Sequence, residues 1–218
     1  MRPTSDAIVV GAGIVGAAIA FRLAERGLHV RILEAADAPA TGSTGRSAAG
    51  VRVQFGSELN VRLSWAGIAE YRDFEATYGV PSGYRPQGYL FLVPEDGWEA
   101  HAAGLALQRA VGVPVEVLDV EAASRLVPFA PEGIAAATFG PIDGVVDPHA
   151  LTLGYLTLAR ERGAALELAT ELTRASYVNG AWQVETSSGV FEAPLVINAA
   201  GAWAGVVAAR AGLVLPVE

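Results

Sequence analysis

A glycine-rich turn near the N-terminus constrains the fold of this chain more than any other feature. Four apolar residues at 7–10 precede Gly11-Ala12-Gly13-Ile14-Val15-Gly16, and an apolar helical pattern continues to residue 26. A second apolar run at 29–33 ends at Glu34, 18 residues beyond Gly16. A buried strand, a GxGxxG turn, a helix and a second strand in this order are typical of a nucleotide-binding βαβ unit.

Each glycine of such a turn has a physical role. Gly11 permits the tight turn out of the strand, Gly13 leaves the backbone open to a diphosphate, and Gly16 lets the helix pack closely on the strand. The helix N-terminus offers unpaired N–H groups and a partial positive charge to the diphosphate. Glu34 is placed to accept hydrogen bonds from ribose hydroxyls. The sequence therefore predicts an adenine dinucleotide site in this segment.

The same segment has a second interpretation, a secretory signal. Residues 7–21 carry no charge, Arg2 precedes them, and residues 18–20 resemble a cleavage site. The run is too short and too rich in glycine to span a membrane. Because strand, turn, helix and terminal acid fall in register, nucleotide binding is favoured, and we expect a cytoplasmic protein with no membrane span. An intact N-terminus in the mature protein would exclude secretion.

Composition excludes several classes of chemistry. The 218 residues include no Cys and no Lys, and all 15 cationic residues are Arg. The chain therefore supplies no thiolate nucleophile, no Schiff-base lysine and no lysine-containing phosphate loop. Because 23 acidic residues bring the formal net charge to −8, nucleic acid is not an expected partner. The three histidines share no ligand spacing, so no metal site is expected and each is predicted to be structural or exposed.

The rest of the chain alternates helical and strand patterns. Helices are expected at 57–78, 95–110, 119–126 and 148–162, the first of them amphipathic. A hairpin is expected at 84–93 and a short strand at 115–118. Later strands are expected at 166–169, 171–178, 181–186, 190–192 and 195–198, and residues 213–218 resemble the start of another. The turns at 179–180 and 187–189 predict a three-stranded meander.

A second segment of small residues, 39–50, has two interpretations of equal weight. It is a flexible Gly/Ser loop, or it is a short helix start whose hydroxyls and N–H groups bind a phosphate or a carboxylate. In the second interpretation, Arg46 inside the segment and Arg52 two residues beyond it would also contact the anion.

Five segments resemble the FAD-dependent amine oxidoreductases of the D-amino-acid oxidase superfamily, in particular the branch of sarcosine oxidase, glycine oxidase and the proline dehydrogenase β-subunit. They are the residues of 6–34, GSTGRSAAGVRVQF at 42–55, PQGYLFL at 86–92, DGVVDPHAL at 143–151 and VINAAGAWA at 196–204. The resemblance covers nearly the whole chain, and its most specific part is 42–55. It implies an α/β fold: a Rossmann-like FAD-binding domain at 1–80 and 145–218 with an inserted β-meander, and part of an α+β substrate domain at 81–144.

The resemblance also implies a non-covalent FAD site. The residues that it places at the cofactor are Gly11, Ala12, Gly13, Ile14, Val15, Gly16, Glu34, Ala35, Ser43, Thr44, Arg46, Ser47, Leu172, Ala200, Gly201 and Trp203. The glycine turn would line the pyrophosphate, Glu34 would bind the adenosine ribose, and Leu172 would contact adenine through its backbone. Arg52, the candidate catalytic residue, would lie near the flavin ring, where a cation stabilises reduced flavin or a substrate carboxylate. The 42–50 loop contains no Cys or His, so no covalent tether is expected from it.

The activity implied by the resemblance is FAD-dependent oxidation of the C–N bond of a small amino acid or secondary amine, by hydride transfer to the flavin. Members of the family run well past Glu218, so a second polypeptide is expected to supply the C-terminal half. One alternative is a non-catalytic, truncated flavin-binding module that needs a second chain. Another is a nicotinamide-dependent dehydrogenase, which the glycine turn permits but the long insertion after the second strand disfavours.

Overall fold

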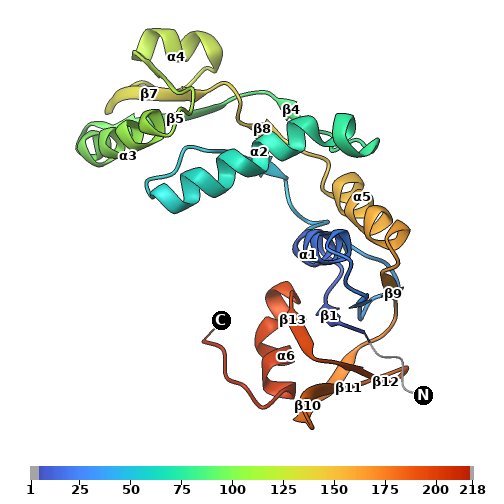
Figure 1. The fold of residues 1–218 in the computed structure, drawn as a ribbon. Coiled ribbons are helices and arrows are strands. Elements are labelled where there is room, and N and C mark those ends of the chain that lie inside the picture. Colours follow the sequence, from blue (N-terminus) through green and yellow to red (C-terminus); the bar gives the residue numbers. More distant parts are fainter. Residues whose placement is uncertain (1–4, 217–218) are drawn as a thin grey trace. The chain divides into compact units, whose positions relative to one another are not determined.

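The computed structural model describes residues 5–216 (Figure 1). A four-stranded parallel sheet joins strands from the N-terminal segment with strands from the C-terminal part of the chain. The strand order is β13-β1-β2-β9. These strands are β1 (Ala7–Val10), β2 (Val30–Leu33), β9 (Ala165–Glu167) and β13 (Leu195–Asn198). All four β1 side chains are buried, as expected for a strand with parallel neighbours on both sides. The apolar run at 7–21 that resembles a secretory signal thus forms an inner strand of the sheet, the glycine turn and the first part of the helix that follows.

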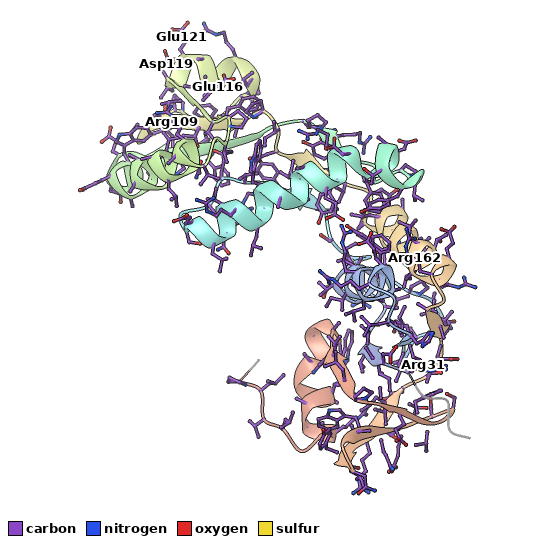
Figure 2. All side chains as sticks on the ribbon, viewed as in Figure 1. Arg31, Arg109, Glu116, Asp119, Glu121 and Arg162 are labelled. Atoms are coloured by element: carbon purple, nitrogen blue, oxygen red, sulfur yellow. The ribbon has the colours of Figure 1, made fainter. Side chains whose placement is uncertain are left out.

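Two helices that are far apart in sequence pack together in this part of the chain. They are α1 (Ile14–Glu25) and α5 (Pro148–Glu161). Phe21 of α1 is fully buried, and its ring centroid lies 5.8 Å from that of Tyr155 on α5. The guanidinium of Arg162, just beyond α5, lies 4.9 Å from the centroid of the same Phe21 ring (Figure 2). These contacts bring the chain after residue 147 back onto the N-terminal βαβ unit.

The predicted meander is present. It consists of β10 (Leu172–Val178), β11 (Ala181–Thr186) and β12 (Gly189–Ala193), which pair in antiparallel fashion. Asn179 and Gly180 both have positive φ, as a two-residue hairpin turn of this type requires. The meander shares a core with β1, β2 and α6 (Ala204–Arg210), which follows the short 3-10 helix η2 (Gly201–Trp203). The α/β class, the Rossmann-like sheet and the inserted meander are therefore confirmed.

Arg31 of β2 links the sheet to the meander. It pairs with Glu167 of β9, and its guanidinium lies 4.6 Å from the centroid of the Phe191 ring on β12 (Figure 2). A guanidinium can stack on an aromatic face while its N–H groups bind a carboxylate, so one side chain serves both contacts.

Residues 48–147 form a second compact unit, and residues 1–47 and 148–218 form the first. The sequence placed the limits of the flavin-binding domain at 80 and 145, whereas the units divide at 47/48 and 147/148. The long helix α2 (Glu58–Tyr78) falls in the second unit because Val61 and Ile68 share a core with Leu105 of α3 (Trp98–Ala110). Which unit holds which ligand stays a prediction.

The second unit contains two small antiparallel sheets. One has the order β3-β8-β4, formed by β3 (Gly50–Val51), β8 (Gly144–Val145) and β4 (Arg85–Pro86). The other has the order β5-β7-β6, formed by β5 (Tyr89–Pro94), β7 (Ile134–Gly140) and β6 (Glu116–Leu118). The helix α4 (Val120–Leu126) follows β6, and the 3-10 helix η1 (Glu95–Gly97) precedes α3.

Two sequence expectations for strands were wrong. Residues 84–93 do not form a hairpin, because β4 pairs with β8 and β5 pairs with β7. Residues 213–216 have no regular secondary structure, so the described part of the expected last strand is absent, and residues 217–218 lie outside the described range. Among residues 5–216, no helix has the length and apolarity that crossing a membrane requires.

Candidate functional site

Two glycines of the N-terminal turn are required by the packing of the backbone. Gly11 has φ +107°, and a Cβ there would lie 2.5 Å from the carbonyl oxygen of Ala199. A Cβ on Gly16 would lie 1.9 Å from the carbonyl oxygen of Gly11. Strand, turn and helix therefore approach one another too closely for any side chain, as the glycine spacing predicts.

Gly13 differs from these two, because the fold itself leaves room for a side chain. Its φ of −75° suits any residue, and a Cβ there would meet only the hydroxyl oxygen of Thr44, at 3.1 Å. Glycine at this position keeps open a partly exposed stretch of backbone at the start of α1. This opening is what a diphosphate needs in order to reach the backbone, so the local geometry fits that group.

The N-terminus of α1 is suited to an anion. Its N-cap residue, Gly13, has no side chain, and the N–H of Ile14 donates to Oγ1 of Thr44 at 3.1 Å. Val15, in the first turn, is 60% exposed. The N–H groups of the first turn have no carbonyl partner four residues earlier within the helix, and the helix dipole adds positive potential. Thr44, predicted from the second small-residue loop, is thus brought to the glycine turn.

Glu34 lies at the end of β2, next to the same turn. One carboxylate oxygen accepts a hydrogen bond from the N–H of Ala12 at 2.7 Å, and the other accepts one from the N–H of Ala36 at 3.0 Å. Each carboxylate oxygen has two lone pairs, so both retain capacity for a sugar hydroxyl. The carboxylate is therefore oriented in advance, by backbone groups, beside the turn that it was predicted to assist.

The other predicted cofactor residues are distributed over the loops of the first unit. Ala35, Ser43, Arg46 and Ser47 are exposed. Trp203 is 55% exposed, and its ring lies 3.5 Å from the position of a Cβ on Gly42. Ala200 is half-buried, and Gly201 is exposed with φ +55°. Leu172 is buried, and its carbonyl oxygen accepts a hydrogen bond from the guanidinium of Arg210 at 2.5 Å. Their contacts with a cofactor stay predictions.

His149 is a residue that sequence reasoning did not connect with the site. A Cβ on Gly45 would lie 2.9 Å from Cε1 of its imidazole, so His149 packs against the second small-residue loop. Its position just inside the start of α5 was visible, but only the folded chain brings that helix to the loop. Among residues 5–216, no group of His, Asp and Glu side chains is arranged to hold a metal ion.

Arg52 lines a pocket of about 420 Å³ within the second unit. The lining residues are Gly50, Val51, Arg52, Phe55, Leu63, Ser64, Gly67, Ile68 and Tyr71. The guanidinium carbon of Arg52 lies 4.9 Å from the ring centroid of Phe55 and 5.6 Å from that of Phe91. Burial raises the pKa of Tyr71, with a smaller contribution from Glu70, so its phenol is a neutral group at pH 7. One cation among apolar walls and hydroxyls suits a small carboxylate with an apolar part.

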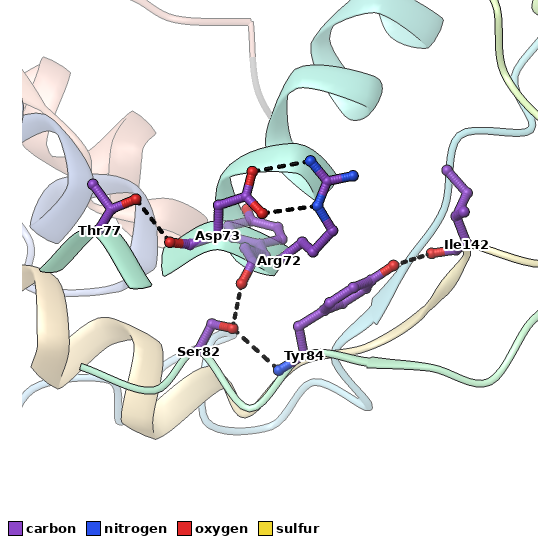
Figure 3. A network of polar contacts seen from close by, with 7 residues as sticks. Arg72, Asp73, Thr77, Ser82, Tyr84 and Ile142 are labelled. Carbon is purple, nitrogen blue, oxygen red and sulfur yellow. Dashed lines mark hydrogen bonds and ion pairs between the residues drawn. The ribbon is translucent and has the colours of Figure 1, made fainter. Parts of the chain in front are cut away.

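A group of hydrogen bonds fixes the C-terminal half of α2 beside this pocket (Figure 3). The hydroxyl of Ser82 donates to the carbonyl oxygen of Tyr71 at 2.6 Å and accepts from the N–H of Tyr84 at 3.2 Å. The phenol of Tyr84 donates to the carbonyl oxygen of Ile142. Burial, and then the charge of Asp143, raise the pKa of Tyr84, so it stays a donor.

Comparison with known proteins agrees with this geometry. The sequence profile of the family described as FAD dependent oxidoreductase (DAO) matches residues 6–218. The chain is 31% identical to glycine oxidase of Geobacillus kaustophilus over 97% of its length, and 27% identical to human mitochondrial dimethylglycine dehydrogenase over 99%. Its fold matches the crystal structure of L-proline dehydrogenase from P. horikoshii with a TM-score of 0.88, at 32% identity over the full chain.

The chain spans only part of each of these relatives. It covers 58% of the glycine oxidase, 25% of the dimethylglycine dehydrogenase and 58% of the proline dehydrogenase chain. The profile match extends over almost all of this sequence and includes the glycine turn, Glu34 and Arg52. The chain therefore belongs to the DAO family of FAD-dependent oxidoreductases.

Proposed function

We propose that this chain binds FAD without a covalent bond and forms part of an oxidoreductase that oxidises the C–N bond of a small amino acid or secondary amine. The observation that carries the proposal is the convergence of an open helix N-terminus, the hydroxyl of Thr44 and the oriented carboxylate of Glu34 on one glycine turn. FAD, when bound, supplies the two-electron acceptor for the reaction.

Residues of the first unit have separate roles in holding the adenosine diphosphate half of FAD. The backbone at Gly13 and the first turn of α1 face the diphosphate, and Glu34 accepts from the ribose hydroxyls. Because Ala12 and Ala36 already hold the carboxylate, little side-chain entropy is lost when the sugar binds.

In the second unit, Arg52 is the candidate for holding the substrate. The relatives named above are described as acting on glycine, dimethylglycine and proline, each of which carries a carboxylate next to its amine carbon. A guanidinium binds a carboxylate through paired N–H donors, and the contacts of Arg52 with two aromatic rings leave it an ordered group in a pocket. Arg52 therefore orients the substrate and takes no part in proton transfer.

The length of the relatives supports a further proposal, that repeated turnover needs additional polypeptide beyond the residues present here, whereas a single reduction of the bound flavin does not. The chain covers between 25% and 58% of the three proteins compared above. The alternative is a flavin-binding module that is not catalytic by itself.

Anaerobic reduction of the bound flavin tests these proposals. The full chain, loaded with FAD and freed of excess cofactor, is mixed with glycine, sarcosine, dimethylglycine and L-proline, and the visible flavin absorbance is followed. At least one of these substrates should bleach the flavin. Arg52→Met should slow this reduction at least about tenfold, whereas Arg62→Met, which removes an exposed arginine of the same unit, should not.

The other outcomes separate the alternatives. Bound flavin that no substrate reduces would support the non-catalytic module. Failure to bind FAD at all would contradict both forms of the proposal.

A further inference from the structure

A buried carboxylate that the proposed function does not use is hydrogen-bonded to the residues that follow Arg52. Asp143 is 0% exposed. Its Oδ1 accepts a hydrogen bond from the N–H of Val53 at 2.8 Å, and its Oδ2 accepts one from Nε2 of Gln54 at 3.0 Å. Val53 and Gln54 are the two residues that follow Arg52, so Asp143 binds the backbone and side chain of the segment that carries the guanidinium.

The hydrogen bonds that Gln54 makes allow only one orientation of its side-chain amide. Nε2 of Gln54 also donates to the carbonyl oxygen of Tyr89 at 3.0 Å. Because Asp143 and Tyr89 both offer acceptors, the amide of Gln54 cannot be reversed without placing its oxygen against theirs. Its Oε1 then accepts from the hydroxyl of Thr138 at 2.8 Å, and the oxygen of Thr138 accepts from Nε2 of His101 at 2.9 Å.

The turn that carries Asp143 is itself held firmly. Its N–H donates to the carbonyl oxygen of Gly140 at 3.1 Å, and its carbonyl oxygen accepts from the N–H of Gly88 at 2.8 Å. A Cβ on Gly140 would lie 2.4 Å from Oδ2 of Asp143, so the carboxylate is packed against backbone. The preceding residue, Ile142, accepts from the phenol of Tyr84 (Figure 3).

Charge also couples Asp143 to Arg52. Burial raises the pKa of Asp143, whereas the hydrogen bonds from Gln54 and Val53 and the charge of Arg52 lower it. A buried carboxylate is costly unless hydrogen bonds and a nearby cation compensate it, and Arg52 is that cation.

We propose that Asp143 and Gln54 are positioning residues for Arg52, which hold residues 52–54 so that the guanidinium remains against Phe55 and Phe91 in its pocket. This inference rests on the proposed carboxylate-binding role of Arg52. The inference predicts whether neutralising Asp143 tightens or weakens the binding of a carboxylate. As a mere nearby negative charge, Asp143 would repel a bound carboxylate, and its neutralisation would tighten binding. As a positioning residue, it should instead strengthen binding, and its neutralisation should weaken it.

Benzoate, a carboxylate with an apolar ring, is the probe. Its binding to the full chain is measured by isothermal titration calorimetry for the wild type and for variants with a cooperative thermal transition. Arg52→Met should abolish detectable binding. Asp143→Asn should weaken binding about tenfold, because the new amide nitrogen faces either Nε2 of Gln54 or the N–H of Val53, donor against donor in both orientations. Asp73→Asn, which removes an exposed carboxylate of the same unit, should change it less than about twofold.

Thr138 provides a second test that preserves every charge. Thr138→Val removes the hydroxyl that Gln54 and His101 share and should weaken benzoate binding about threefold, whereas Thr138→Ser keeps the hydroxyl and should restore most of the affinity. If Asp143→Asn does not fold, this pair decides the question. Equal affinities for the two Thr138 variants, or unchanged or tighter binding by Asp143→Asn, would overturn the positioning role.

The Nε–H resonance of Arg52, assigned by its loss in Arg52→Met, is a readout that needs no ligand. It should be a single resolved signal in the wild type and in Thr138→Ser, and should broaden or shift in Asp143→Asn and Thr138→Val. A signal that is identical in all of these proteins would also overturn the inference. Wild-type benzoate affinity in Arg52→Met would instead refute the carboxylate site itself, and the positioning role with it.

Discussion

The three glycines of the N-terminal turn separate two requirements that a GxGxxG pattern combines. At Gly11 and Gly16 a side chain would collide with backbone oxygens of the fold itself. At Gly13 the nearest obstacle is a single hydroxyl, and the backbone is partly exposed. The first two positions therefore serve the fold, and the third serves the ligand.

Alanine substitutions should resolve these roles. Gly16→Ala should lower the free energy of unfolding by at least about 3 kcal/mol, because its Cβ would overlap the Gly11 carbonyl oxygen. Gly13→Ala should lower it by less than about 1 kcal/mol but weaken FAD binding at least about tenfold. Urea unfolding and flavin titration measure the two effects. Equal destabilisation by both substitutions would contradict the distinction.

At the level of single residues, the sequence predicted contacts between residues that lie close together along the chain. The glycine turn and Glu34 belong to one βαβ unit, so their spacing predicted their proximity. The contact of Asp143 with Gln54 joins residues 89 positions apart, and no spacing rule connects them. His101 was assigned to a structural or exposed position, and only the folded chain shows its bond to Thr138.

Among the elements, α2 shows how tertiary contacts select one face of a helix. Its aromatic and aliphatic residues were expected on one face, yet Leu59 and Leu63 are 69% and 63% exposed, whereas Val61, Ile68 and Phe74 are buried. Figure 3 shows how its C-terminal half is joined to the following loop through Ser82.

The hydroxyls of Ser82 and Thr77 form a matched pair, because both donate to carbonyl oxygens of α2. Ser82 is 5% exposed, so Ser82→Ala should leave buried groups unpaired and lower the free energy of unfolding by about 1–3 kcal/mol. The hydrogen bond of Thr77 is exposed, so Thr77→Ala should change the free energy of unfolding by less than about 0.5 kcal/mol. Denaturant unfolding measures both, and equal effects would refute the importance of the Ser82 link.

Local patterns predicted β1, α1, β2 and the meander, where neighbouring segments pair with each other. They failed at β7, whose alanine-rich sequence has no strand pattern and which forms only because β5 and β6 flank it. They failed also at 84–93, where each half pairs with a distant strand instead of its neighbour.

For the whole molecule, the chain leaves the first unit at residue 47 and returns to it at 148. The FAD-binding residues predicted from sequence fall in the first unit, and Arg52, the candidate catalytic residue, lies with its pocket in the second. A titrating group that lies in the second unit can therefore be used to probe the stability of that unit.

The burial of His101 predicts that the stability of the molecule depends on pH. Burial lowers the pKa of its imidazole, so the folded chain binds fewer protons than the unfolded chain below the ordinary value of about 6.5. Its contribution is complete above that pH and is lost as the pH falls through the lowered pKa. His101→Gln, which keeps an N–H donor, should lose less stability than the wild type as the pH falls below 6.5. Parallel pH profiles for the wild type and His101→Gln would contradict this assignment.

The most direct test of the account is competition between FAD and ADP for the full chain, followed by the fluorescence of the flavin. Because the glycine turn and Glu34 hold the adenosine diphosphate half, ADP should displace FAD, and riboflavin, which lacks that half, should bind at least about tenfold more weakly. Glu34→Ala should weaken FAD binding about tenfold, and Glu25→Ala, at an exposed acid of the same unit, should not. FAD binding that ADP does not displace and that Glu34→Ala does not weaken would contradict the central claim.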